Sequence, residues 1–423
     1  MQRLDKANVL LVVIDCLKAD RILENAGGAS LENMRNLADE GCMFTEAISV
    51  TSTTTPSVAS ILTGCYPVRH GIRSLSGYRL NDNIITMAEV LRHVGYHTYA
   101  EVTGALIGKT GLKRGFEIWN WRRLSESVHS NWGQQFLTNL RNGFFQQPYF
   151  LLLHLLELHE PRIVPSKFKG RRFGKTTYDQ ALSAVDWWVG ELLSLVDRER
   201  TTIVLTSDHG ERVENNPIVK YVADIYNLPR RILRRVGLAR LWPPLNVIGH
   251  GFGVREDLIR IPLIVSGYGI RKGLLVDDLV RQIDIMPTIM EIVCAPSDLR
   301  SVQGRSLYPL MTGKTLVPEA AYVEACGITL RNRNNWLASI RTQEWKYIRG
   351  LFNTKLPERL YNLKADPTES RNLSKDPLYA QILEDFRALM ENIQTGVPVR
   401  QEALSAEDQK AIEENLRQLG YID

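Results

Sequence analysis

Four short segments are apolar at nearly every position, and they constrain the fold more than any other feature of the chain. They are residues 9–15, 149–156, 202–208 and 261–267. Continuous apolar runs of this length are typical of strands that are buried on both faces. Segments with helical periodicity lie between them, at 30–41, 86–96 and 177–197. The pattern predicts an α/β fold in which helices sandwich a mostly parallel sheet.

The C-terminal part of the chain has a different pattern. Short antiparallel strands and a final charged amphipathic helix are expected there, at residues 320–325, 336–350, 358–366 and 405–423. We therefore expect an α/β domain over residues 1–315. A smaller α+β subdomain, with an antiparallel sheet and a terminal helix, is expected over residues 316–423.

Composition limits the partners and the compartment. A net charge of +5 is small for 423 residues, and no nucleic-acid-binding motif accompanies it, so we expect no nucleic-acid partner. The five cysteines are widely spaced and include no C-x-x-C pair, which favours a reducing compartment. The N-terminal apolar run is short, ends at Asp15 and lacks a cleavage site, which predicts a strand instead of a signal peptide. Because no apolar segment is long enough to span a membrane, a cytoplasmic location is expected.

Acidic and imidazole side chains follow three of the predicted strands. Asp15 ends the first strand, Glu157 and His159 follow the second, and Asp208 and His209 end the third. In a parallel sheet the carboxyl ends of the strands meet at one edge, where ligands bind. These side chains are therefore expected to converge.

Asp15, Asp208 and His209 form a candidate site for one divalent cation. Carboxylates and an imidazole without a thiolate suit Mn, Zn, Mg or Ca, and the sequence does not rank these ions. The Ser-Asp-His-Gly run is also good turn chemistry, so a structural turn is the alternative. Cys16 follows Asp15, and strand alternation predicts that its side chain points away from the site as a core residue.

Residues 51–57, with the sequence TSTTTPS, predict the start of a helix. A threonine before Pro56 can cap that helix. A hydroxyl at a helix N-terminus is also well placed for nucleophilic attack, because the helix dipole favours an anion there. A divalent cation beside such a hydroxyl would lower its pKa.

The order of motifs along the chain resembles one known group of proteins. The stretches NVLLVVIDCLKAD, TPSVASILTGCYPVRHGI, HLLELHEP, SDHGE and GHGFGVREDLIRIPLIV are similar to the sulfatase-like branch of the alkaline phosphatase superfamily. The resemblance implies an alkaline phosphatase-like fold and attack by a side chain that is bound to a metal ion. On the family's nucleophile-x-Pro-Ser pattern, Thr54 is the nucleophile. The metal ligands implied by the resemblance are Asp15, Thr54, Asp208 and His209, with a second metal ion possible.

Two departures from the family pattern bear on the chemistry. Sulfatases carry the motif Cys-x-Pro-x-Arg at the nucleophile, and the cysteine is oxidised to formylglycine. This chain has Thr54 at the position of the cysteine and Val58 at the position of the arginine. Thr53 and Thr55 are then capping and packing residues. The Lys-x-His block that holds the sulfate in sulfatases is also missing. A formylglycine hydrate expels sulfate by collapsing to the aldehyde, which a threonine ester cannot do.

The departures favour a metal-dependent phosphoester hydrolase or phosphoryl-group transferase that works through a phosphothreonine on Thr54. The substrate is expected to be an anionic phospho- or sulfo-ester. One alternative is a sulfatase-like hydrolase of sulfuric esters that works without formylglycine. The other is an inactive binding scaffold of the same fold.

His159 and His250 are further catalytic and substrate-binding candidates. His159 follows a strand end, and His250 lies between glycines, which permit close approach to a ligand. Either could bind the substrate oxygens or protonate the leaving group. The alternative is that they hold a second metal ion with help from Glu157. His154 lies within a buried run and is expected to be a hydrogen-bonded polar residue.

A basic insertion is expected at about residues 212–248. Within it, residues 227–246 are amphipathic, with arginines at positions 230, 231, 234, 235 and 240 and Trp242 among the apolar residues. A solvated lid helix has this pattern. The alternative is peripheral contact with an anionic membrane or with a large anionic substrate.

Replacing Arg230, Arg231, Arg234 and Arg235 by Gln is expected to weaken co-sedimentation with anionic liposomes, because each arginine near such a surface contributes roughly 1 kcal/mol. The same change should raise the KM of a large anionic substrate more than that of a small aryl phosphate. If the parent protein does not bind liposomes and both substrates respond equally, the segment is a solvated lid.

Overall fold

The computed structural model of the chain describes residues 6–213, 225–226, 228–229, 250–295, 302–328, 333–395 and 403–419. Its strands are β1 (Asn8–Ile14), β2 (Gly41–Ile48), β3 (His97–Thr103), β4 (Ile118–Arg122), β5 (Tyr149–Leu155), β6 (Thr201–Thr206), β7 (Arg260–Gly267), β8 (Leu274–Arg281), β9 (Ala321–Ala325), β10 (Leu337–Arg341), β11 (Trp345–Gly350) and β12 (Arg359–Asn362). Its helices are α1 (Ala19–Leu23), α2 (Glu32–Asp39), α3 (Thr54–Thr63), α4 (Pro67–His70), α5 (Met87–His93), α6 (Asn131–Arg141), α7 (Thr177–Ser194), α9 (Glu256–Ile259), α10 (Ile285–Ile292), α11 (Tyr308–Met311), α12 (Ala380–Thr395) and α13 (Ala406–Gln418).

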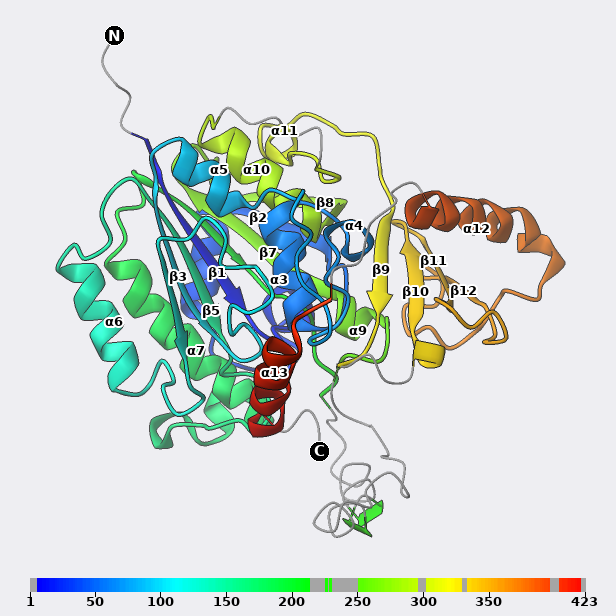
Figure 1. The fold of residues 1–423 in the computed structure, drawn as a ribbon, viewed down its shortest axis with the longest axis horizontal. Helices are drawn as coiled ribbons and strands as arrows, with labels where there is room; N and C mark the ends of the chain where they lie inside the picture. Colours follow the sequence, from blue (N-terminus) through cyan, green and yellow to red (C-terminus); the bar gives the residue numbers. More distant parts are fainter. Residues whose placement is uncertain are drawn as a thin grey trace.

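The larger sheet has eight strands in the order β4-β3-β5-β1-β6-β7-β2-β8 (Figure 1). All of its neighbouring pairs are parallel except the two that β7 makes with β6 and β2. The mostly parallel sheet predicted from the apolar runs is therefore confirmed. The run at 261–267 forms the strand that points the other way, so the segment before β7 lies at the same edge as the carboxyl ends of β1, β5 and β6.

Helices cover both faces of this sheet, and the side chains of β1 alternate between the two resulting cores. Val9, Leu11 and Val13 belong to a core that includes residues of α3, α5 and α10. Leu10, Val12 and Ile14 belong to a second core that includes residues of α2, α6 and α7. Such double coverage explains why the central strands are apolar at every position.

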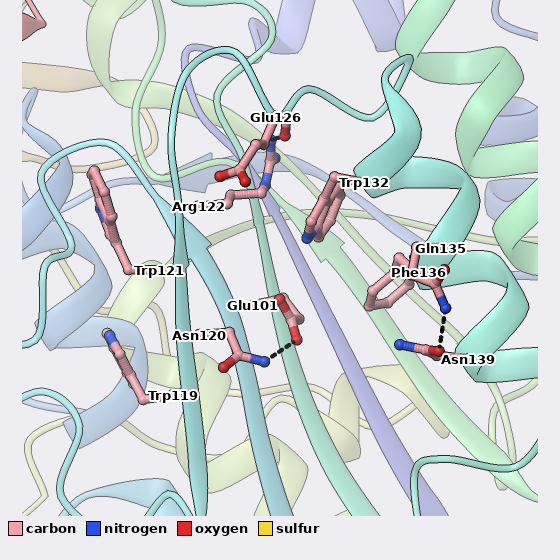
Figure 2. A pocket seen from close by; sticks show the side chains of 10 residues that line it. All are labelled: Glu101, Trp119, Asn120, Trp121, Arg122, Glu126, Trp132, Gln135, Phe136 and Asn139. Atoms are coloured by element: carbon pink, nitrogen blue, oxygen red, sulfur yellow. Dashed lines mark hydrogen bonds between the residues drawn. The ribbon is translucent and has the colours of Figure 1, made fainter.

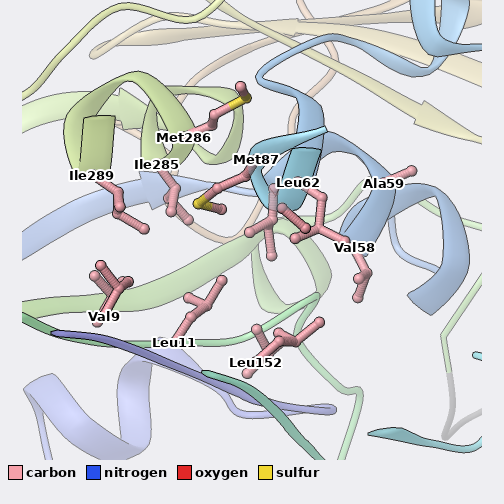
Figure 3. Close-up of a cluster of buried hydrophobic side chains, with 14 of the residues drawn as sticks. Val9, Leu11, Val58, Ala59, Leu62, Met87, Leu152, Ile285, Met286 and Ile289 are labelled. Atoms are coloured by element: carbon pink, nitrogen blue, oxygen red, sulfur yellow. The ribbon is translucent and has the colours of Figure 1, made fainter. Parts of the chain in front are cut away.

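Helix α3 is buried along its whole length. Figure 3 shows Val58 and Leu62 of α3 in one apolar cluster with Leu11 of β1, Leu152 of β5 and residues of α10. Full burial of an aliphatic side chain of this size stabilises the fold by about 1.5–3 kcal/mol. The packing fixes the helix against the sheet, and its first residue then lies at the sheet's carboxyl edge.

The smaller sheet has four antiparallel strands in the order β12-β11-β10-β9, with α12 beside it (Figure 1). A bridge between Thr51 and Glu324 of β9 connects it to the segment before α3. Glu324 also pairs with Arg73 through two guanidinium nitrogens. This confirms the predicted antiparallel C-terminal sheet. The predicted domain boundary at 315/316 falls between α11 and β9 and stays a prediction.

The terminal helix α13 packs beside the larger sheet's carboxyl edge. Ile412 and Leu416 of α13 form an apolar cluster with Leu75, Ala105 and Leu156. An ion pair of 3.0 Å between Lys109 and Asp408 adds a polar contact at the same junction. The helix therefore belongs by its contacts to the wall around that edge.

None of the helices within the described residues is long and apolar enough to cross a bilayer. The predicted cytoplasmic location stays a prediction. Apart from Leu228 and Pro229, the arginine-rich segment 227–246 lies outside the described residues.

Candidate active site

The predicted metal ligands meet at the carboxyl edge of the larger sheet. Asp15 follows β1, Asp208 and His209 follow β6, and Thr54 is the first residue of α3. The Thr54 hydroxyl lies 3.3 Å from Asp15 Oδ2 and 3.5 Å from His209 Nε2. His209 Nε2 lies 3.7 Å from Asp15 Oδ1 and 3.4 Å from Asp208 Oδ2. The structure thus brings all four side chains together, and each is buried.

Two carboxylate oxygens in this cluster have no hydrogen-bond partner among the described residues. They are Asp15 Oδ1 and Asp208 Oδ2. Donor atoms of Asp15, Asp208 and His209 all lie within 4.8 Å of one another. Buried charge is costly unless it is paired or coordinates a metal ion. The two orphaned oxygens and the imidazole therefore fit a divalent cation, and the three residues could hold one together with the Thr54 oxygen.

Backbone contacts fix the orientation of the Asp208–His209 pair. His209 Nδ1 donates to the Gly210 carbonyl at 2.8 Å, which leaves Nε2 as the nitrogen with a lone pair. Asp208 Oδ1 accepts from the backbone N–H groups of His209 at 2.8 Å and Cys16 at 3.3 Å. These bonds turn Oδ2 toward the cluster. The turn predicted from Ser-Asp-His-Gly and the ligand geometry are therefore compatible.

Ser57 and Gln282 attach the start of α3 to this turn. The Ser57 hydroxyl donates at 2.6 Å to the Asp208 carbonyl, which also accepts from Gln282 Nε2 at 2.9 Å. Gln282 Nε2 also lies 3.0 Å from the Ser207 carbonyl, and Gln282 Oε1 accepts from the backbone N–H of Val50 at 3.3 Å. All of these groups are buried. The distance between Thr54 and the Asp208–His209 pair is therefore set by hydrogen bonds one turn further along the helix.

The threonines beside Thr54 behave differently from the simple capping interpretation. Thr53 is the N-cap residue, as predicted, but its side chain makes no capping hydrogen bond. Its hydroxyl lies 3.2 Å from that of Thr51 instead. The Thr55 hydroxyl is buried and has no hydrogen-bond partner among the described residues, as expected of a packing residue.

His250 and His159 lie at the same edge, and the His250 ring bridges the other two histidines. The His250 ring centroid is 4.3 Å from that of His209 and 5.2 Å from that of His159. His250 precedes the antiparallel strand β7, which explains how a residue so late in the chain reaches this edge. Burial lowers the pKa of His159. Burial has the same effect on His250, but the Glu211 carboxylate outweighs it and raises the pKa of His250.

Glu211 is the acidic partner that sequence reasoning missed. It accepts from His250 Nδ1 at 3.3 Å and pairs with Arg162 Nη2 at 3.5 Å. Burial opposes ionisation, but these facing cations lower the pKa of Glu211 to about 2. Its place three residues after Asp208 in SDHGE was the available signal. Gln282 and Ser57 carried no such signal, because neither residue type is acidic or imidazole.

Two neighbouring residues have partners that differ from those the sequence indicated. Glu157 is bound at 3.1 Å by Arg122 and at 2.8 Å by the backbone N–H of Val128. The alternative of a second metal ion at His159 and His250 stays a hypothesis. His154 is buried, but its ring nitrogens have no hydrogen-bond partner among the described residues. Its Nε2 lies 3.9 Å from Asp208 Oδ2, so it lies next to one of the candidate metal ligands.

Cys16 is a buried core residue, as predicted, but its side chain does not point away from the site. Strand β1 ends at Ile14, and Cys16 has a left-handed backbone with φ of 64°, so strand alternation no longer applies. Its Sγ lies 3.5 Å from Glu211 Oε2 and 3.6 Å from His250 Nδ1. Burial and the adjacent Asp15 carboxylate raise the pKa of the Cys16 thiol well above its usual range. The thiol therefore faces the candidate site.

A separate cavity of about 370 Å³ lies between β4 and α6. Figure 2 shows Trp132 and Phe136 of α6 facing Glu101 and Asn120 of the sheet. None of the candidate metal ligands lines it. Its Arg122 is the residue that binds Glu157, and this pairing accounts for the position of Glu157.

Comparison with known proteins assigns the chain to a class of ester hydrolases. The sulfatase family profile matches residues 7–294, and the profile of the C-terminal part of N-sulphoglucosamine sulphohydrolase matches residues 253–396. The chain belongs to the sulfatase family, within the alkaline phosphatase-like superfamily, and is a sulfatase-family hydrolase. The resemblance stated from the motifs is thereby confirmed.

Curated relatives and solved structures agree with this family. Human arylsulfatase H is 23% identical over 95% of this chain and 94% of its own length. The N-acetylgalactosamine-6-O-sulfatase of Bacteroides thetaiotaomicron is 23% identical over 93% of this chain and 94% of its own length. The phosphonate monoester hydrolase of Silicibacter pomeroyi has the same fold, with a TM-score of 0.70 at 21% identity over 92% of this chain and 96% of that one.

Replacing Gln282 by Leu is expected to lower the free energy of unfolding by about 1–3 kcal/mol, because buried donors and acceptors lose their partner. It should also lower kcat in folded protein, because Thr54 is no longer held against the Asp208–His209 turn. Denaturant unfolding and steady-state kinetics measure the two effects. Gln343→Leu removes a comparable but exposed hydrogen bond to the Asp277 carbonyl and should change stability by less than about 0.5 kcal/mol. Unchanged stability and kcat in Gln282→Leu would contradict the positioning role.

Proposed function

We propose that the protein is a metal-dependent phosphoester hydrolase or phosphoryl-group transferase with Thr54 as its nucleophile. The observation that carries the proposal is the position of the Thr54 hydroxyl at the start of α3. It lies 3.3 Å from Asp15 and 3.5 Å from His209, next to two buried carboxylate oxygens without partners among the described residues.

Asp15, Thr54, Asp208 and His209 would hold one divalent cation. Such an ion acts as a Lewis acid that lowers the pKa of a hydroxyl beside it and offsets negative charge on a phosphoryl oxygen. Mn, Zn, Mg and Ca all suit carboxylate and imidazole ligands. The ion's identity is left to measurement.

The chain's own residues supply the remaining functions in a two-step transfer. In the first step the Thr54 hydroxyl loses its proton to solvent, its oxygen forms a bond to phosphorus, and the ester bond to the leaving alcohol breaks. The N-terminus of α3 faces this point and favours negative charge there. His159 or His250 gives a proton to the leaving oxygen. In the second step water, or an acceptor hydroxyl in a transferase, attacks the same phosphorus and loses its proton to the same histidine. The bond between phosphorus and the Thr54 oxygen breaks, and Thr54 takes up a proton from solvent.

The identity of residue 54 favours phosphate over sulfate. In a sulfatase with formylglycine, the aldehyde hydrate expels sulfate by reforming a carbonyl group. Thr54 has no second hydroxyl on the same carbon, so its ester must be cleaved by an external attack. Transfer through a phosphothreonine meets this requirement, and the release step then needs only water or an acceptor.

Sulfate-ester hydrolysis is the second candidate, and the names of the relatives favour it. Arylsulfatase H and N-acetylgalactosamine-6-O-sulfatase both match nearly the full chain. The structural neighbour from Silicibacter pomeroyi is a phosphonate monoester hydrolase, which supports a phosphorus substrate in the same fold. Either way the substrate is an anionic ester, and nucleic acid is not proposed as a partner.

Thr54→Ala is expected to abolish turnover of the preferred ester while the protein stays folded, because one lost hydroxyl hydrogen bond costs only about 1 kcal/mol. The measurement uses aryl phosphate monoesters, aryl phosphodiesters, aryl phosphonates and aryl sulfates, each with added Mn, Zn, Mg or Ca. We expect the phosphorus esters to be turned over faster than the sulfates. Circular dichroism checks the fold of each variant.

Thr53→Ala and Thr55→Ala are the matched controls, because each removes a neighbouring buried hydroxyl that lies outside the proposed ligand set. Both should keep measurable activity. Loss of activity in Thr53→Ala with activity retained in Thr54→Ala would move the nucleophile by one residue. Faster turnover of aryl sulfates would select the second candidate.

A further inference from the structure

A sulfur donor lies beside the candidate metal ligands. One donor atom from each of Cys16, His209 and His250 lies within 4.8 Å of the other two. The Cys16 side chain is fully buried, and its Sγ lies 3.6 Å from His250 Nδ1. We propose that these three residues form a second position for a thiophilic divalent cation of the zinc class. This position competes with the carboxylate position for His209.

The backbone of Cys16 is held so that its thiol faces this position. Its N–H donates to Asp208 Oδ1 at 3.3 Å, and its carbonyl accepts from the Tyr178 hydroxyl at 2.7 Å. The following N–H, that of Leu17, donates to the Ser207 hydroxyl at 3.0 Å. These hydrogen bonds at Cys16 and at the next residue therefore fix the backbone of Cys16, and with it the orientation of the thiol toward the site.

The orphaned carboxylates provide an independent sign that a cation belongs next to His209. Asp15 Oδ1 and Asp208 Oδ2 are buried without hydrogen-bond partners in the described part of the chain, and both lie within 3.7 Å of His209 Nε2. Asp15, Asp208 and His209 form the other set of mutually close donors, so His209 is the residue that the two sets share.

The shared histidine makes the two positions exclude each other. His209 Nδ1 donates to the Gly210 carbonyl, so Nε2 carries the ring's single available lone pair. One lone pair binds one ion at a time. A cation that uses His209 with Cys16 therefore cannot be present together with a cation that uses His209 with Asp15 and Asp208.

The chemistry of the ligand atoms indicates which ions bind at the cysteine position and which bind at the carboxylate position. Thiolate and imidazole select zinc and similar soft ions, whereas carboxylates and hydroxyls suit manganese, magnesium and calcium. Binding breaks the Cys16 S–H bond, and the proton leaves to solvent. That thiol lies 3.5 Å from Glu211 Oε2, which also accepts from His250 Nδ1 at 3.3 Å. An ion bound between Cys16 Sγ and His250 Nδ1 would replace this contact, and the His250 ring would then carry its proton on Nε2.

Cadmium tests the proposal without any substrate, since its bond to a thiolate gives an ultraviolet charge-transfer band. Titration of the full chain with Cd²⁺ should produce this band. Cys16→Ser should lose the band and bind Cd²⁺ about 10-fold or more weakly, since even groups outside the ligand shell change metal affinity by that factor. Cys294→Ser is the matched control, because Cys294 is exposed, and it should keep the band. Circular dichroism and retained Mn²⁺ binding show that Cys16→Ser is folded.

Competition tests the shared histidine. In the parent protein loaded with Mn²⁺, added Cd²⁺ should release Mn²⁺, seen by electron paramagnetic resonance, as the charge-transfer band grows. A band that grows while Mn²⁺ stays bound would overturn the competition. A band that persists in Cys16→Ser, or that disappears in Cys294→Ser, would overturn the site. These readouts do not depend on Thr54 or on which ester is cleaved, so their failure is distinguishable from failure of the proposed function.

Discussion

The hydrogen bonds that the Asp208 carbonyl accepts from Ser57 and Gln282 hold the candidate site together. They connect the turn that follows β6 with helix α3, which packs against the larger sheet. Because the donors and acceptors are buried, leaving them unpaired is costly, and the arrangement is correspondingly rigid. Thr54 lies one turn before Ser57, so its distance from Asp15 and His209 follows from this connection and not from its own weak contacts.

The buried negative charge at this edge of the sheet explains why the site fits a cation. Three carboxylates are buried there, and among them Glu211 is paired with a guanidinium, that of Arg162, as well as with His250. In the ion pairs of the described residues, Asp15 and Asp208 face imidazole rings only. Asp15 and Asp208 each have one oxygen without a partner in the same part of the chain. Uncompensated buried charge would destabilise the fold by several kcal/mol. A divalent ion at His209 would offset both charges, and in the proposed function the same ion would lower the pKa of the adjacent hydroxyl.

The central strands of the larger sheet could be predicted from the sequence, whereas its edge strands could not. β1, β5, β6 and β7 are buried on both faces and therefore appear as continuous apolar runs. β4 and β8 lie at the edges of the sheet, and β8 carries Asp277 and Asp278 on exposed positions, so apolar runs do not reveal them. The direction of β7 was equally hidden, because burial alone carries no information about strand polarity.

The same distinction applies to the site. Asp15, Asp208 and His209 could be located because residues at strand ends share an edge. Cys16 could not, because the strand ends two residues earlier and its left-handed backbone turns the thiol inward. Glu157 was expected at the site from its position in the sequence, but the pairing with Arg122 depends on a contact with β4 that no local pattern reveals. Side chains whose direction depends on tertiary partners were thus the ones misjudged.

The central claim is that one cation lies between Asp15, Thr54, Asp208 and His209. Crystals grown with Mn²⁺ and measured at the manganese absorption edge test it most directly, since anomalous scattering locates the ion without assumptions about activity. The account predicts one anomalous peak within bonding distance of these four side chains. It also predicts that the peak is lost in Asp208→Ala. A peak elsewhere, or one that persists at this place in Asp208→Ala, would contradict the account.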